Sequence, residues 1–230
     1  MNQLLAPDLV DLTRGAPIVP PVRLQPPPAR PALDDDGFRA LFNGRDTSGW
    51  RMAGCGGFVV VDGRLESVPG NDLGLFWCTD ATPADFVLRV DWLRWRHEDA
   101  SGVFVRFPEP SGPPEANPAF VAIQRGFEVQ IDEVGIPGAS AIHRTGAIFN
   151  QPVQRLFPRT ARPPGEWNAF EISVRGQHYT VALNGEPVAV FDNADPARGR
   201  CGTPAAPSYV GLQVYPGSRV AFRDVRIRPF

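Results

Sequence analysis

The chain of 230 residues is long enough for one large all-β domain, and 43% hydrophobic residues with 10% aromatic residues exclude a wholly disordered protein. Its net charge of −2 lacks the basic excess of a nucleic-acid-binding protein. No apolar run reaches the length of a membrane-spanning helix, and the three cysteines show no zinc or disulfide spacing. We therefore expect no nucleic-acid partner, no membrane segment, no metal and no cofactor.

The N-terminal residues 1–36 form an extension that differs in composition from the rest. Eight prolines lie between Pro7 and Pro31, and such a segment favours an extended, polyproline-like path. We expect this extension to pack on its own domain or on another subunit, which would make the protein a homo-oligomer. No basic segment followed by an apolar run opens the chain, so a cytoplasmic location is expected. The following segment, Gly37–Phe42, is predicted to form a single helical turn.

Residues 37–230 are predicted to form one domain of short strands separated by turns. The dipeptides Asp62–Gly63 and Asn184–Gly185 each separate two alternating runs, a pattern typical of tight β-hairpins. The predicted strands are Phe58–Val61, Arg64–Ser67, Leu75–Cys78, Phe86–Arg94, Ser101–Phe107, Phe127–Asp132, Thr145–Phe149, Asn168–Arg175, His178–Leu183, Glu186–Asp192, Tyr209–Tyr215 and Val220–Ile227. This number of strands without a long helical pattern predicts an all-β sandwich of two antiparallel sheets.

One predicted strand carries a row of polar side chains opposite a row of apolar ones. Successive side chains of a strand point to opposite faces, so Phe127, Val129 and Ile131 share the core face. The other face then carries Glu128, Gln130 and Asp132. Carboxylates and amides at a spacing of about 7 Å suit the hydroxyls of a sugar, although a solvated outer face has the same pattern.

Other segments add candidate residues to this polar face. The same alternation places Arg106 opposite Val103 and Val105, and it places Gln213 and Tyr215 opposite the apolar members of their strand. His143 follows a loop and is the best candidate for proton transfer, because the pKa of histidine lies near neutrality. Glu166, at the entry to another strand, is expected to order a turn.

The sequence resembles the 3-keto-disaccharide hydrolase domain family over roughly residues 38–230. The matching pieces, in order along the chain, are Leu41–Asp46 with Trp50, Ser101–Arg106, Phe127–Asp132, Thr145–Phe149, Gly165–Asn168, Leu183–Gly185, Gly211–Gln213 and Val220–Ile227. The resemblance implies a jelly-roll sandwich of the concanavalin A-like lectin and glucanase type, which binds saccharides on a concave sheet face. It also implies cleavage of glycosides that already carry a ketone at carbon 3.

Such cleavage needs a base for the proton on carbon 2, a donor for the enolate and an acid for the leaving group. The resemblance implies Glu128 or Asp132 as the base, Arg106 or Arg144 as the enolate partner and His143 as the acid. Gln130 and Gln213 would hold sugar hydroxyls.

One position departs from the family, whose members often carry histidine two residues after the glutamine that matches Gln213. Here Tyr215 occupies that position; it can donate a hydrogen bond or stack on a sugar, but it is a poor proton carrier near neutral pH. Two functions are therefore expected as alternatives. The first is cleavage of a 3-keto-glycoside by elimination or net hydrolysis, and the second is carbohydrate or protein binding without catalysis.

Overall fold

The computed structural model describes residues 33–34, 36–112, 116–135 and 139–230. They belong to one compact unit, Pro31–Phe230. The expectations for the Pro-rich extension concern residues 1–36 and, apart from Leu33, Asp34 and Asp36, lie outside the described residues. Those on subunit crossing and oligomer formation therefore stay predictions.

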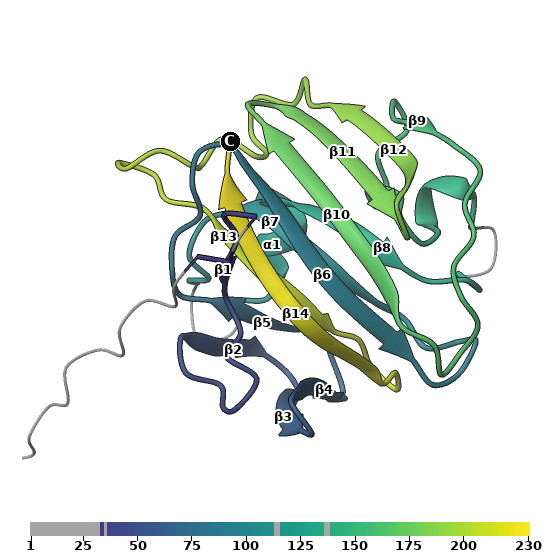
Figure 1. The fold of residues 1–230 in the computed structure, drawn as a ribbon. Helices are drawn as coiled ribbons and strands as arrows, with labels where there is room; N and C mark the ends of the chain where they lie inside the picture. The colour runs from purple at the N-terminus through teal and green to yellow at the C-terminus, as the bar shows by residue number, and fades with distance from the viewer. Residues whose placement is uncertain (1–32, 35, 113–115, 136–138) are drawn as a thin grey trace, which may run out of the picture. The chain divides into compact units, whose positions relative to one another are not determined.

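The larger of two antiparallel sheets has nine strands and forms one layer of the unit (Figure 1). Its strands are β1 (Arg39–Ala40), β3 (Gly57–Val61), β4 (Arg64–Val68), β6 (Phe86–Arg94), β9 (Arg155–Leu156), β10 (Asn168–Arg175), β11 (His178–Leu183), β12 (Glu186–Asp192) and β14 (Val220–Pro229). They follow the order β3-β4-β14-β6-β10-β11-β12-β9, and β1 pairs with β14. The longest strands, β6, β10 and β14, lie at its centre.

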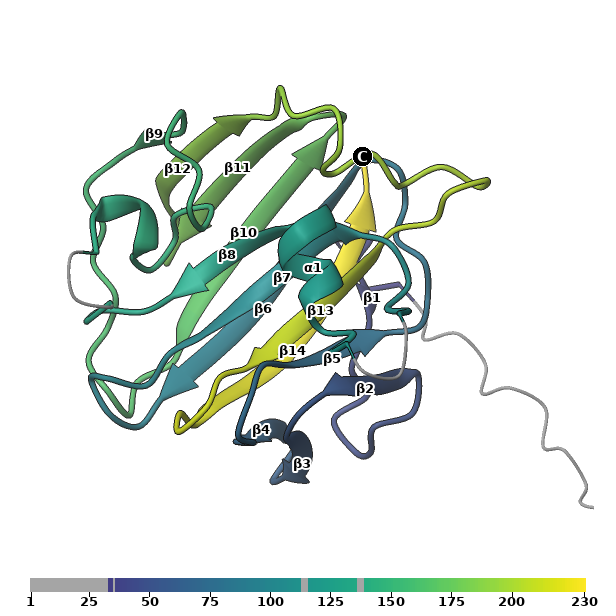
Figure 2. The same ribbon diagram turned by 180° about the vertical axis from the view of Figure 1, so that it is seen from behind.

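The smaller sheet has five strands in the order β2-β5-β13-β7-β8. They are β2 (Trp50–Gly54), β5 (Gly74–Cys78), β7 (Ser101–Phe107), β8 (Phe127–Ile131) and β13 (Tyr209–Val214). A short helix, α1 (Phe120–Arg125), covers the outer face of this sheet over β7 and β13 (Figure 2). No helix in the described part of the chain is long and apolar enough to cross a lipid bilayer.

The space between the sheets holds the main hydrophobic core. Trp92, Phe170 and Ile172 enter it from the larger sheet, and Val129 and Leu212 enter it from the smaller one. A second apolar cluster lies on the other face of the smaller sheet, where Leu75, Phe104 and Phe107 pack against Ala119 and Ala122 of the helical segment. The predicted two-sheet antiparallel sandwich is confirmed.

Both predicted hairpins are present, and their turns explain the residues found there. The turn between β3 and β4 has φ of 47° at Asp62 and 79° at Gly63, and the turn between β11 and β12 has φ of 53° at Asn184 and 89° at Gly185. Positive φ at both central residues matches the twist of the flanking strands, and Asn, Asp and Gly tolerate it best.

Two predicted secondary-structure elements of this domain are wrong. Thr145–Phe149 is a loop, because Gly146 has φ of 84° and the N–H of Ala147 bonds back to Arg144 in a turn. The loop nevertheless lies against β8: the N–H of Phe149 donates to the Glu128 carbonyl at 2.8 Å. Gly37–Phe42 contains the short strand β1 instead of a helical turn, since β14 offers it a pairing edge.

Candidate active site

A pocket of about 320 Å³ lies on the outer face of the smaller sheet, between β8 and α1. Its polar lining residues are Asp72, Glu128, Gln130, Asp132, His143 and Gln213. Its apolar and aromatic lining residues are Leu73, Phe120, Ile123, Phe149, Tyr215 and Pro216. The predicted row on β8 thus faces a cavity, and the alternative of a merely solvated face is wrong.

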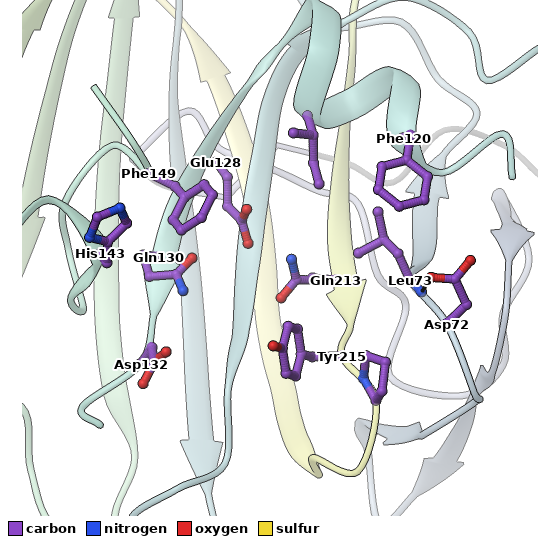
Figure 3. Close-up of a pocket in the computed structure, with 12 residues that line it drawn as sticks. Asp72, Leu73, Phe120, Glu128, Gln130, Asp132, His143, Phe149, Gln213 and Tyr215 are labelled. Carbon is purple, nitrogen blue, oxygen red and sulfur yellow. Dashed lines mark hydrogen bonds between the residues drawn. The ribbon is translucent and has the colours of Figure 1, made fainter. Parts of the chain in front are cut away.

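The two kinds of lining residue lie mostly on opposite sides (Figure 3). We call the side formed by β8 and the loop after it, with Glu128, Gln130, Asp132, His143 and Phe149, the polar wall. We call the side formed by Leu73, Phe120 and Ile123 the apolar wall. Gln213 and Tyr215, from the end of β13, lie between the two walls in Figure 3.

Glu128 is placed by the pairing of β8 with β7. Phe104 of β7 lies opposite Glu128, and Gly102 lies opposite Gln130. Gly102 leaves room for this carboxylate, because a Cβ at that position would force the Oε1 atom and the carboxyl carbon of Glu128 to move. The carboxylate therefore fills the space that a side chain on β7 would otherwise take.

The surroundings of the Glu128 carboxyl group strongly shift its pKa. Its side chain is buried, with the residue only 4% exposed, and no donor among the described residues reaches Oε1. Desolvation by burial raises the pKa of Glu128 well above its ordinary value of 4.5, and the charge of Asp132 raises this pKa further. A carboxyl group with a raised pKa that faces a cavity is a typical general base or acid.

Two amide oxygens are buried without a hydrogen-bond donor among the described residues, as Oε1 of Glu128 is. The Oε1 atoms of Gln130 and Gln213 are buried, and they too lack a donor among the described residues. Buried polar atoms in folded proteins nearly always have partners, because leaving one unpaired is costly. Figure 3 shows the side chains of Glu128, Gln130 and Gln213 directed into the same space. They are positioned to bind the hydroxyl or hydroxyl-like donors of a ligand.

Asp132 lies at the end of the polar wall and also holds the chain after β8. Its Oδ1 atom accepts the backbone N–H groups of Val134 at 2.8 Å and Gly135 at 2.6 Å. One carboxylate oxygen is thus committed to the turn, whereas Glu128 makes no such bond at Oε1. This difference favours Glu128 over Asp132 as the proton-transfer group.

We expect Asp132→Asn to move the pH dependence of activity toward acid. The amide oxygen of asparagine can still accept both backbone N–H groups, so the turn is kept, but the negative charge that raises the pKa of Glu128 is lost. The ionised base then forms at lower pH, and the rising acidic limb of kcat/KM shifts to lower pH. Asp72→Asn is the control, because Asp72 lines the same pocket but is not among the causes of the raised pKa of Glu128. If the acidic limb of kcat/KM for Asp132→Asn stays at the pH of the original protein, the assignment of this limb to Glu128 is wrong.

His143 belongs to the polar wall, as predicted. It ends the short 3-10 helix η1 (Ala141–His143), and its Nδ1 atom accepts the backbone N–H of Ser140 at 3.1 Å. In the neutral ring the proton is therefore on Nε2, which can donate to a ligand. The ring also packs edge-on against Phe149, with 5.5 Å between the ring centroids.

Arg106 does not take part in this pocket, contrary to the sequence prediction. It has φ of 58°, and the pairing of β7 with β13 shifts register beside it, so a bulge changes the alternation of side chains. Its guanidinium donates to the carbonyl oxygens of Cys201 at 2.8 Å and Gly176 at 3.1 Å. Arg106 therefore holds loops at the end of the sandwich.

We expect Arg106→Met to lower stability without changing the chemistry. The variant keeps most of the side-chain volume but loses the buried hydrogen bonds, which should reduce the free energy of unfolding by about 2–4 kcal/mol. Urea denaturation measures this loss, and kcat/KM at a temperature where the variant is folded should stay within about twofold of the original. A large loss of activity at unchanged stability would instead indicate that Arg106 takes part in the reaction.

Arg144 is also outside the pocket, because its guanidinium donates to the carbonyl of Glu133 at 2.7 Å. It links the chain after β8 to the residues after η1. Neither arginine predicted as an enolate partner lines the cavity. The donors that do line it are the amides of Gln130 and Gln213, His143 and the hydroxyl of Tyr215.

The apolar wall and Gly102 are not among the site residues predicted from the sequence. Leu73, Phe120 and Ile123 lie just before a strand or in a helix too short to show a periodic pattern, so no sequence signal marks them. Gly102 had a signal: a glycine inside a strand indicates a bulge or a close approach. Within the described ranges, no cluster of three or more His, Cys, Asp and Glu side chains is arranged to hold a metal ion.

Several solved structures share this fold at low sequence identity. A candidate glycosyl hydrolase from Parabacteroides distasonis ATCC 8503 superposes with a TM-score of 0.66 and 21% identity, covering 87% of this chain and 99% of that chain. A protein of unknown function with a galectin-like fold from Bacillus subtilis gives a TM-score of 0.54 and 14% identity, covering 83% and 94%. Winged bean acidic lectin, complexed with methyl-α-D-galactose, gives 0.54 and 13%, covering 81% and 93%. At these identities the likeness shows the fold alone.

No curated protein matches the chain. The family comparison is more specific, because a single family model matches residues 37–228, nearly the whole of the described domain. This confirms the resemblance carried by the sequence motifs. The chain belongs to the family described as the 3-keto-alpha-glucoside-1,2-lyase-like domain.

Proposed function

We propose that the pocket binds a glycoside oxidised to a ketone at carbon 3 and removes the substituent on carbon 1 by elimination. The observation that carries the proposal is the buried carboxyl of Glu128, which lines the cavity and has a raised pKa, and whose Oε1, like the amide oxygens of Gln130 and Gln213, has no hydrogen-bond partner among the described residues. Membership of the family supports the same substrate class.

The chemistry follows from the ketone. It acidifies the proton on carbon 2, which Glu128 removes, and the electron pair of that C–H bond becomes an enolate. The enolate collapses to a double bond between carbons 1 and 2, the C1–O bond breaks, and the leaving oxygen takes a proton. The products are a free alcohol and an unsaturated ketone, so no oxidant or reductant is consumed. Addition of water to the double bond would make the net reaction a hydrolysis.

The remaining polar wall supplies hydrogen bonds in this proposal. The Nε2–H of His143 can donate to an oxygen that gains charge, either the enolate or the leaving group. Gln130 and Gln213 accept sugar hydroxyls through Oε1 atoms that have no partner in the described part of the chain, and they fix the ring relative to Glu128. Histidine and amide side chains thus take the role for which the sequence had suggested an arginine.

The test uses matched substrates with and without the ketone. The full chain is incubated with 3-keto-trehalose and 3-keto-phenyl glucoside, and with their unoxidised parents, and released alcohol and enone absorbance are followed after subtraction of the enzyme-free rate. We expect release from both ketones and none from the parents. Absence of enzyme-dependent release from both ketones would overturn the proposal.

A second candidate function, saccharide binding without catalysis, is favoured by the same three oxygens, which lack partners within the described ranges, because acceptors suit hydroxyl recognition whether or not a proton moves. Binding of the unoxidised parents together with inert ketones would support this function.

A further inference from the structure

The apolar wall differs chemically from the polar wall across the same cavity. Leu73, Phe120 and Ile123 offer no side-chain hydrogen-bonding group, and neither does Pro216, which also lines the pocket. Asp72 is the charged residue of this side, and its oxygens already accept the N–H of Leu73 at 2.7 Å and the amide of Asn117 at 2.9 Å. A ligand on this side meets mainly carbon.

Two rings at the cavity are unusually open to solvent. Phe120 is 39% exposed and Tyr215 is 41% exposed, although both line the pocket. An exposed phenylalanine at the edge of a cavity gains by being covered, and aromatic side chains stack favourably on other rings. These rings are suited to a flat apolar group.

The orientation of the sugar follows from the proposed function, on which this inference rests. A ring whose carbon 2 reaches Glu128 lies on the polar wall, where its hydroxyls find Gln130 and Gln213. Carbon 1 is the neighbour of carbon 2, so its substituent extends into the remaining volume beside the apolar wall. A second sugar there would bury hydroxyls against carbon with few partners, which is costly.

We propose that the apolar wall selects the leaving group and that the preferred leaving groups are aromatic alcohols instead of a second sugar. Phe120 is the main specificity residue, and Tyr215 assists it from the end of β13. Cleavage would then release a phenol: the C1–O bond breaks with its electron pair on the phenolic oxygen, which takes up a proton.

Phe120→Ser tests this assignment without interference from leaving-group chemistry. Phenols leave more readily than sugars, so the informative quantity is the ratio of kcat/KM for 3-keto-phenyl glucoside to that for 3-keto-trehalose, compared between the two proteins. We expect the variant to lower this ratio by about tenfold. Phe230→Ser, which removes an exposed phenylalanine outside the pocket, should leave the ratio unchanged.

Calorimetry with unoxidised ligands gives a second readout that does not need catalysis. We expect phenyl glucoside to bind the original protein about tenfold more tightly than trehalose, and Phe120→Ser to remove this difference. The inference is overturned if Phe120→Ser leaves both the kcat/KM ratio and the binding preference unchanged. It is also overturned if the original protein binds phenyl glucoside and trehalose equally. Failure of the proposed function gives a different result: neither 3-keto substrate is cleaved, whereas the binding preference can still be measured.

Discussion

Glu128→Gln is expected to lower kcat/KM on a 3-keto-glycoside by about two to four orders of magnitude, because the amide cannot accept the proton from carbon 2. The side chain keeps its shape and its position over Gly102, so binding of an unoxidised glycoside should change little. Steady-state rates and calorimetry on the same preparation separate the two effects. Full activity of the variant would remove Glu128 as the base and transfer the role to Asp132.

The same substitution should stabilise the protein above acidic pH. Burial raises the pKa of Glu128 in the folded state above 4.5, so the folded protein holds the proton more tightly than the unfolded chain. The contribution of this proton to the free energy of unfolding is complete below pH 4.5. It is lost as the pH rises through the raised pKa of Glu128 in the folded protein. We therefore expect the Tm of Glu128→Gln to exceed that of the original protein at pH 8, and the gap to close as the pH approaches 4.

Glu166→Gln is the matched control for both measurements. Glu166 is exposed, and in the described structure its carboxylate makes no hydrogen bond, so the predicted turn-ordering role is wrong. The neighbouring Asn168 orders that segment instead, since its Oδ1 accepts the N–H of Arg162 at 2.8 Å. Activity and Tm of Glu166→Gln should match those of the original protein at both pH values.

Gly102→Ala should reduce activity by about a hundredfold with no change in any polar group. The new methyl group occupies the position of the Glu128 carboxylate, so that side chain must rotate away from its present place in the pocket. A displacement of about 1 Å in a reacting group is enough for an effect of this size. Displacement should also change the environment of Glu128, so the acidic limb of the pH profile should move together with the loss of rate.

Gly57→Ala is the control for the loss of glycine from a strand. Gly57 lies in β3, and a Cβ there meets no atom within 4 Å. We expect its kcat/KM and Tm to be close to the original values. If Gly102→Ala were as active as Gly57→Ala, the carboxylate would have room to move without consequence, and its present position would carry no catalytic meaning.

The alternation of side chains along strands was enough to predict five of the twelve residues that line the pocket. It placed Glu128, Gln130 and Asp132 on one face of β8 and added Gln213 and Tyr215, all of which line the pocket. The rule works here because Val129 and Leu212 must enter the core between the sheets, which fixes the register of their strands.

The rule failed at Arg106 for a local reason. Phe104 and Phe107 both lie in the cluster under α1, although residues separated by three positions should face opposite sides. The positive φ of Arg106 and the register shift beside it account for the change. A bulge of this kind depends on pairing with β13, a partner distant in the sequence, so the local pattern does not reveal it.

One short stretch of chain contributes to both walls of the pocket. Phe120 and Ile123 of α1 are followed, after the close corner at Gly126, by Glu128 and Gln130 of β8. The framework that carries this stretch is the double sheet, whose core does not use the exposed ring of Phe120. A substitution in α1 can therefore alter the apolar wall without changing Glu128 or Gln130. Under the proposed function, the preference for a leaving group and the proton-transfer step are then separable by mutation.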